Sequence, residues 1–208
     1  MYIPELEKQL AAARARLHDV VHPLKSVSDG CAAYEAVAVA QRALAAAKKE
    51  EYADRYDVGF VPEAAVSEPV LLQTDHAAVL TFSAMRERED GKREDAGYGV
   101  LELDLCSLTK FGYPNDEALP GHPLYERGLS DYGVFEVKNS AWIRSMTEHN
   151  RVAFPDTPDS KARHFIITFH DSTFECIARG VRASLSSKPY VELFEDIRKI
   201  VFPHAKNA

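Results

Sequence analysis

The stretch from Arg163 to Gly180 constrains the fold more than any other part of the sequence, because its residues alternate in polarity on both sides of a turn-forming pair. Successive side chains of a β-strand point to opposite faces of the sheet, so this alternation assigns each residue to a face. Asp171 and Ser172 favour a turn because their short polar side chains bond to nearby backbone groups. We therefore predict a β-hairpin centred on these two residues. Its apolar face pairs Phe169 with Phe174, Ile167 with Cys176, and Phe165 with Ala178.

The opposite face of this hairpin mixes ionisable, hydroxyl and aliphatic side chains. A solvated face is expected to carry more lysine and less isoleucine, whereas a fully covered face is expected to carry fewer charges. The mixture predicts partial cover by a loop, a helix, a second subunit or a ligand. The residues of this face are His164, Ile166, Thr168, His170, Thr173, Glu175, Ile177 and Arg179.

The first 56 residues predict two helices joined by a short turn. Pro4 suits the first turn of a helix, and apolar residues follow at helical spacing up to a boundary at His22. An alanine-rich second helix is predicted from about Ala32 to Tyr56. We expect residues 1–56 to form a helical hairpin that serves as an interaction or dimerisation extension, and residues 57–208 to form an α+β domain.

The remaining chain alternates predicted strands with a long loop and two helices. Strands are predicted at 76–88, 98–106 and 132–138, and the loop runs from Ser107 to Pro123. Asn139 or Ser140 is expected to cap a helix that buries Trp142. Ser187 is expected to cap the last helix. This order favours an α+β fold, in which the helical hairpin precedes a mainly antiparallel sheet of about five strands with helices packed on one face.

Composition narrows the class of protein. The chain has 208 residues, a formal net charge of -7, and three cysteines placed far apart without a CxxC pair. The negative charge argues against a general nucleic-acid binder, which needs a positive field to release counterions. The sequence contains no run of about 18 apolar residues and no secretory signal. We expect a soluble, cytoplasmic protein that has no disulfide framework and does not associate with membranes.

Candidate functional residues come from the polar face of the hairpin, a neighbouring strand and the long loop. Carboxylates near histidines are the groups used in general acid–base catalysis. The competing interpretations are a solvated sheet face and a surface loop whose shape is set by its prolines. Neither a cofactor nor a metal is assigned from the sequence. The candidate catalytic residues are His170, Asp171, Glu175, Glu136 and His122.

Two functions remain open at this point. The first is a binding or regulatory protein that acts through protein–protein or small-ligand contacts, with the N-terminal helices as the surface for a partner or a second copy. It rests on the lack of a complete catalytic motif and on the alanine-rich helices. The alternative is a small hydrolase- or lyase-type enzyme that uses the histidine and carboxylate cluster. A concave pocket with convergent polar groups would favour the enzyme.

Overall fold

The computed structural model describes residues 2–22, 26–75, 77–88 and 92–203, and it contains two antiparallel five-stranded sheets. The first sheet contains, in spatial order, β1 (Tyr52–Arg55), β7 (Gly133–Lys138), β8 (Arg163–Thr168), β9 (Thr173–Ala178) and β6 (Leu108–Gly112). The second contains β10 (Gly180–Ser186), β5 (Arg93–Asp104), β4 (Ala78–Glu87) and β2 (Val61–Pro62), and β3 (Val70–Gln73) also pairs with β4.

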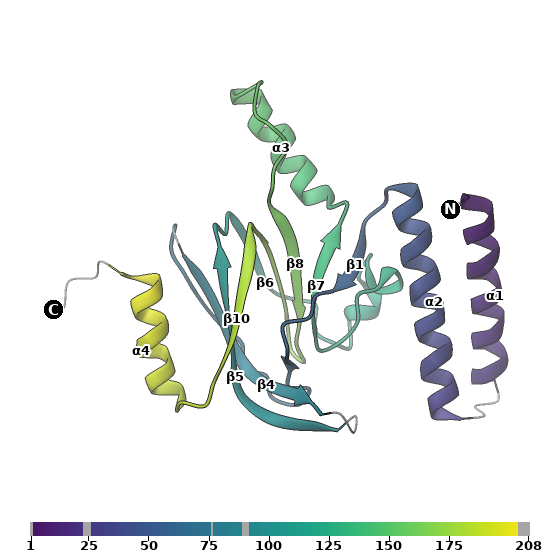
Figure 1. Cartoon of the computed structure of the whole chain (residues 1–208), viewed down its shortest axis with the longest axis horizontal. Coiled ribbons are helices and arrows are strands. Elements are labelled where there is room, and N and C mark those ends of the chain that lie inside the picture. The colour runs from purple at the N-terminus through teal and green to yellow at the C-terminus, as the bar shows by residue number, and fades with distance from the viewer. Residues whose placement is uncertain (1, 23–25, 76, 89–91, 204–208) are drawn as a thin grey trace.

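The described part of the chain also forms four α-helices, which lie around these sheets (Figure 1). The N-terminal pair, α1 (Ile3–Val21) and α2 (Val27–Lys48), is antiparallel, and Lys48 Nζ lies 2.8 Å from Glu7 Oε1 across it. This pair packs through α2 against β1 and against a 3-10 turn, η2 (Tyr125–Arg127). Helix α3 (Ala141–Ala153) projects beyond the sheets, and α4 (Tyr190–Val201) packs on β3 and β4 of the second sheet.

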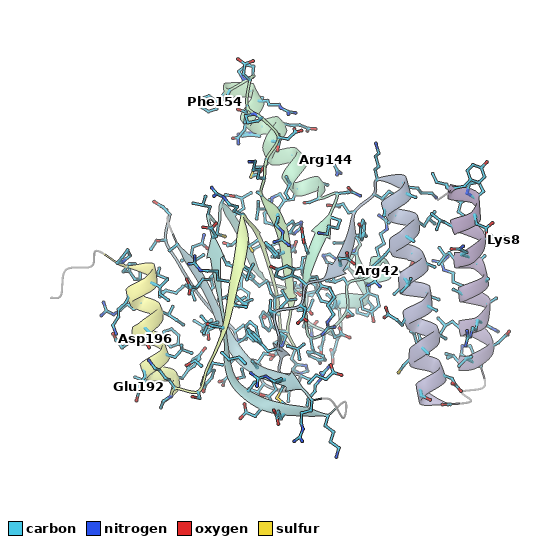
Figure 2. All side chains as sticks on the ribbon, in the orientation of Figure 1. Lys8, Arg42, Arg144, Phe154, Glu192 and Asp196 are labelled. Carbon is cyan, nitrogen blue, oxygen red and sulfur yellow. The ribbon has the colours of Figure 1, made fainter. Side chains whose placement is uncertain are left out.

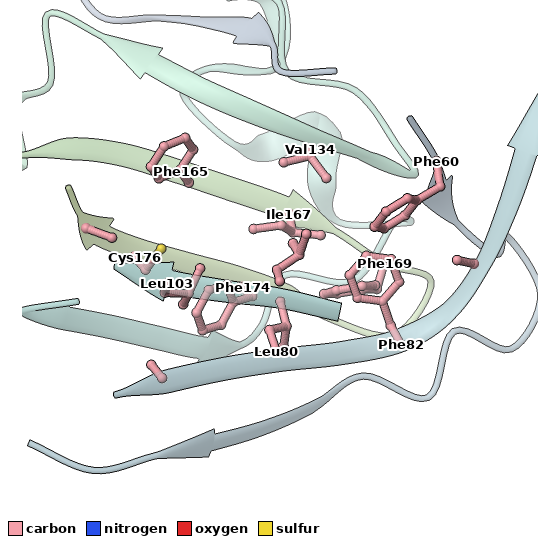
Figure 3. Close-up of a cluster of buried hydrophobic side chains, with 14 residues drawn as sticks. Phe60, Leu80, Phe82, Leu103, Val134, Phe165, Ile167, Phe169, Phe174 and Cys176 are labelled. Carbon is pink, nitrogen blue, oxygen red and sulfur yellow. The ribbon is translucent and has the colours of Figure 1, made fainter. Parts of the chain in front are cut away.

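The core lies between the two sheets (Figure 3). Phe165, Ile167 and Phe174 of the first sheet pack with residues of β4 and β5, and all three are fully buried. The ring centroids of Phe82 and Phe169 are 5.2 Å apart in an edge-to-face contact that joins β4 to the β8–β9 turn. The predicted apolar face of the hairpin is thus confirmed as a core face.

The hairpin register differs from the predicted one by two residues. Phe165 pairs with Cys176 and Ile167 with Phe174, and Phe169 donates its backbone N–H to Ser172 O at 2.9 Å. The turn is therefore centred on His170 and Asp171 rather than on Asp171 and Ser172. A shift of two keeps every side chain on its predicted face, because the side-chain period of a strand is two residues.

The α+β class, the N-terminal helix pair and the antiparallel pairing agree with the sequence analysis, and the structure adds a second sheet. Helix α2 starts at Val27 and ends at Lys48, so the predicted helix over 32–56 was placed too far along the chain. Residues 52–55 are strand β1 instead, and 108–112 of the predicted loop are strand β6. The strands β2, β3 and β10 were not predicted. His76, in the predicted strand at 76–88, lies outside the described residues.

Within the described ranges, no helix has both the length and the apolar character that crossing a membrane requires.

We expect Phe82→Ala to lower the free energy of unfolding by about 3–5 kcal/mol, because it leaves a cavity between the sheets. Phe154→Ala is the matched control, since this side chain is 66% exposed at the distal end of α3 (Figure 2). The control should change the free energy by less than about 0.5 kcal/mol. Urea denaturation followed by circular dichroism measures both, and equal losses in the two variants would contradict the assigned core.

Candidate functional site

Residues 113–132, called here the covering loop, lie over the outer face of the first sheet. Leu119, Leu124 and Leu129 of this loop pack on Phe135 and Ile166, and all five side chains are buried. The loop is the cover that the mixed composition of the hairpin's polar face predicts. It explains the isoleucine on that face, because Ile166 lies in a second apolar cluster rather than in solvent.

Polar side chains of the same face anchor the covering loop. Thr168 Oγ1 donates to Ser130 O at 2.9 Å, and Thr173 Oγ1 donates to Pro114 O at the same distance. At the hairpin turn, His170 Nδ1 lies 2.7 Å from Asp116 Oδ2. The hydroxyl and imidazole groups of the hairpin therefore hold both ends of the loop to the sheet.

The Asp116 carboxylate joins two side chains at this anchor. Tyr132 donates its hydroxyl hydrogen to Asp116 Oδ2 at 2.5 Å, beside the contact with His170. The hydrogen bond to Asp116 raises the pKa of Tyr132 to about 12. The hydrogen bond to Asp116 and its negative charge together raise the pKa of His170. The hydrogen bond from Tyr132 is the largest effect on Asp116 and lowers its pKa; burial opposes it, and the hydrogen bond and charge of His170 lower the pKa further.

A pocket of about 330 Å³ opens where the covering loop meets the start of α3 and strands β6, β8 and β9. It is called here the Trp142 pocket. Larger hollows occur elsewhere, such as one of about 570 Å³ that includes Arg86 and Leu185, but the Trp142 pocket combines buried ionisable groups with an aromatic wall. It is lined by Glu51, Lys110, His122, Pro123, Leu124, Ala141, Trp142, His164 and Glu175.

A chain of four polar side chains begins in this pocket and ends at the N-cap of α3. Lys110 Nζ donates to Glu175 Oε1 at 2.9 Å, and Glu175 Oε2 lies 3.3 Å from His164 Nε2. On the other side of the imidazole, His164 Nδ1 is 3.0 Å from Ser140 Oγ. Burial alone would raise the pKa of Glu175, but the contacts with His164 and Lys110 outweigh burial and lower it to about 2. Glu175 is therefore an ionised carboxylate near neutral pH.

The hydrogen positions on His164 follow from its neighbours. Ser140 is the N-cap of α3, and its Oγ accepts a hydrogen bond from Ile143 N at 3.2 Å. The Ser140 hydroxyl hydrogen is then available to His164 Nδ1, so we assign the ring hydrogen to Nε2. The Nε2 atom is buried, with almost no surface within reach of solvent or of a ligand, and Glu175 Oε2 at 3.3 Å is the charged group beside it.

His122 reaches the pocket from the covering loop. Its Nδ1 accepts a hydrogen bond from Leu124 N at 3.2 Å, which leaves the hydrogen of a neutral ring on Nε2. Burial lowers the pKa of His122, with the nearby charge of Glu175 acting in the opposite direction. Burial is the larger effect and favours the neutral ring, and in this form Nε2 is a donor.

The rim of the pocket is built by the first turn of α3 and by the chain that leaves the helix pair. Glu51 Oε1 accepts a hydrogen bond from Ala141 N at 2.5 Å, so a carboxylate caps the positive end of α3. Trp142 follows on the same turn, and its ring meets that of His164 edge to face at 5.3 Å. Trp142, predicted as a core residue, is half-buried and forms a pocket wall.

The structure separates the five predicted site residues. His122 and Glu175 line the Trp142 pocket together. His170 and Asp171 form the hairpin turn, with 4.0 Å between Nε2 and Oδ1, and His170 serves the loop anchor described above. Of the predicted cluster, two residues therefore share a pocket, and the catalytic role assigned to all five from the sequence stays a prediction.

Glu136 lies on the other face of the first sheet, which is a correction to its predicted position beside Glu175. It pairs across the ladder with Phe165, whose side chain is in the core between the sheets. Arg163 holds it with a two-pronged contact, Nε to Oε1 at 3.0 Å and Nη2 to Oε2 at 2.5 Å. The Arg163 guanidinium in turn lies 4.8 Å from the ring centroid of Tyr56. The alternation of β7 puts Phe135 under the covering loop, which forces Glu136 to the opposite side.

Three ionisable residues of the pocket were not selected from the sequence, namely Lys110, His164 and Glu51. His164 shares its parity with His170, so the alternation placed it on the polar face without distinguishing its role. Lys110 was predicted to lie in a loop, and the alternation of side chains in strands says nothing about a loop residue. In the structure it belongs to strand β6 and pairs with Glu175. No local signal connects Glu51 with α3, because their contact is formed by the tertiary fold.

No protein-family model, curated protein or solved structure matches this chain. Among residues 2–22, 26–75, 77–88 and 92–203, no three histidine, cysteine, aspartate or glutamate side chains converge as metal ligands would.

The raised pKa of His170 predicts how the loop anchor depends on pH. A group with a raised folded pKa contributes stability that is fully present below its unfolded value of about 6.5 and is lost as the pH rises through the folded value. We therefore expect His170→Gln to lower the melting temperature more at about pH 6 than at about pH 9. Thermal scans across this range measure the difference.

His149→Gln is the control for this experiment, because His149 is an exposed histidine on α3. Its effect on the melting temperature should not grow as the pH falls. A His170→Gln difference that is constant with pH, or that grows toward alkaline pH, would contradict the assigned contact with Asp116.

Proposed function

We propose that this chain is a small-ligand-binding protein whose Trp142 pocket takes a compact, uncharged molecule with a hydrogen-bond acceptor such as a carbonyl or amide oxygen. The observation that carries the proposal is the lining of the pocket, in which the polar side chains of His122 and Lys110 share one hollow of about 330 Å³ with the Trp142 ring. A mostly apolar hollow with a few hydrogen-bonding groups is the usual form of a small-molecule site.

Two donors are left available in the pocket. His122 presents an Nε2–H, and Lys110 uses one of its three N–H bonds on Glu175. Each carboxylate already accepts one hydrogen bond, Glu51 from Ala141 N and Glu175 from Lys110. A ligand that fits this set accepts hydrogen bonds from His122 and Lys110 and places its apolar part against the Trp142 ring, Pro123 and Leu124.

The charges of the pocket favour an uncharged ligand. Lys110 contributes one positive charge, whereas Glu51 and Glu175 contribute two negative charges, and the ring of His122 is neutral. An anion would be repelled by the two carboxylates, and a cation would be repelled by the Lys110 ammonium and would leave the donor of His122 without an acceptor. An amide or ketone oxygen satisfies the donors without adding charge.

The alternative is a small hydrolase- or lyase-type enzyme in which His122 and Glu175 act on a bound substrate. The convergence of His122, His164 and Glu175 in one pocket favours it. The lowered pKa of Glu175, about 2, weighs against it, because so acidic a carboxyl is a weak general base and does not hold a proton to donate at neutral pH. Ser140 is engaged as the cap of α3 and is not among the residues that line the pocket.

Three probes of similar shape test whether the pocket prefers an uncharged ligand. Benzamide is neutral, benzoate is an anion and benzamidinium is a cation. Trp142 is the only tryptophan of the chain, so its fluorescence reports directly on this pocket. We expect benzamide to change the Trp142 emission saturably and to raise the melting temperature, with roughly millimolar affinity for so small a ligand. Benzoate and benzamidinium should bind at least about tenfold more weakly. Preferential binding of either ion, or no saturable response to benzamide, would refute the proposed ligand class.

A pair of substitutions tests whether Glu175 sets this preference. Glu175→Gln removes one negative charge from the pocket, so the affinity for benzoate relative to benzamide should rise by roughly tenfold. Glu136→Gln is the matched control, because Glu136 is similarly shielded and is also paired with cations, Arg163 and Lys138, but lies on the opposite face of the sheet. It should leave the ratio unchanged. An equal change in both variants would show that the effect does not arise in the pocket.

We extend the proposal to a partner protein or a second copy of the chain at the N-terminal helices, in the cytoplasm. Tyr34 and Val39 of α2 are 59% and 49% exposed, which supports a contact surface on this helix. The free state of all three cysteines is compatible with a reducing compartment. Sedimentation of the full chain tests the second copy, and a monomer at high concentration would exclude it.

A further inference from the structure

Two cysteines that are distant in the sequence lie side by side in the fold. Cys176 is a fully buried residue of β9 in the core between the sheets, and Cys106 packs against the same core from the connection between β5 and β6. Cys106 Sγ donates to Leu108 O at 3.6 Å and packs against the core cluster that contains Cys176, and the contact between the two thiols shifts the pKa of each. Cys31, the third cysteine, is an exposed residue of α2.

Backbone hydrogen bonds on both sides of Cys106 fix this contact. Asp104 O accepts from Arg179 N at 2.7 Å, and Ser107 N donates to Ile177 O at 2.8 Å. Cys106 is therefore held between two points of attachment to the strand that carries Cys176. The neighbouring thiols are a consequence of strand pairing rather than of a flexible side chain.

The two thiols differ in access and in acidity. Cys106 is half-buried, and the hydrogen bond from the Cys176 thiol lowers its pKa against the opposing effect of burial. The same contact, together with burial, raises the pKa of Cys176. The thiolate therefore forms on Cys106, which is the residue that solvent reaches, and nucleophilic sulfur chemistry requires the thiolate.

We propose that Cys106 and Cys176 are an oxidisable dithiol that a hydroperoxide closes into an intramolecular disulfide. The Cys106 thiolate attacks a peroxide oxygen, the O–O bond breaks, and hydroxide leaves to give a sulfenic acid. The Cys176 sulfur then attacks the Cys106 sulfur, the S–O bond breaks, and the departing hydroxide takes the Cys176 proton. In total, two thiols lose two electrons and two protons, and hydrogen peroxide becomes two molecules of water.

The disulfide would connect β9 to the chain that leaves β5. Reversible oxidation sites typically contain an accessible cysteine of low pKa beside a second cysteine that forms the disulfide with it. In a reducing compartment the pair stays as thiols, so oxidation would mark exposure of the protein to peroxide. This inference is independent of the ligand proposed for the Trp142 pocket, because the two cysteines and the pocket are on opposite faces of the first sheet.

The full chain with Cys31→Ser tests the proposal, since it retains the pair alone. The folded protein is treated with hydrogen peroxide, quenched, unfolded, alkylated and weighed intact. We expect both thiols to become protected from alkylation, with a mass loss of two hydrogen atoms that dithiothreitol reverses. Two thiols that remain alkylatable, or a mass gain from added oxygen, would overturn the proposal.

Cys106→Ser is the matched control, because it also leaves two cysteines, Cys31 and the buried Cys176. Both substituted positions have access to solvent, so serine is compatible with folding in each variant. Under the same treatment the control should not form an intramolecular disulfide. An intramolecular disulfide in both variants would show that the bond forms in unfolded chains, and this result would also overturn the proposal.

Discussion

Burial of aromatic and branched side chains between the two sheets is the interaction on which the rest of the structure depends. Phe165, Ile167 and Phe174 lie on the inner face of the first sheet, so the pleat turns the residues between them outward. His164, Ile166 and Glu175 therefore project from the outer face. The hydrophobic effect that packs the sheets thereby sets the direction of the ionisable groups, although those groups contribute little to holding the sheets together.

The outer face is used in two ways along its length. Near the hairpin turn, threonine and imidazole groups bind the covering loop, and Ile166 lies beneath its leucines. Toward the other end of β8, where α3 begins, the loop no longer fills the space, and Glu175, His164 and Trp142 surround a pocket. Buried polar groups normally have partners. The anchor satisfies this requirement at the turn, and beside the pocket Lys110 and His164 both contact the Glu175 carboxylate.

The sequence contained enough information for the class, the helix pair, the core face of the hairpin and the existence of cover over its polar face. Periodicity carries these features, because each depends on neighbours within one element. Periodicity did not predict the register of the hairpin. The turn can be centred on Asp171 and Ser172 or on His170 and Asp171, and only packing distinguishes the two. Periodicity also failed for β1, β2 and β3, which are too short to show a period, and for Lys110 and Glu51, whose places depend on contacts with distant segments.

Strand β1 follows the helix pair directly and forms one edge of the first sheet, where it pairs with β7. The helices and the sheets are therefore joined by shared hydrogen bonds and not by a free linker. A shortened protein that starts after residue 56 would lose this strand and would present the N–H and C=O groups of β7 as a bare edge. Such edges recruit strands from other molecules, so the truncated sheets would tend to aggregate.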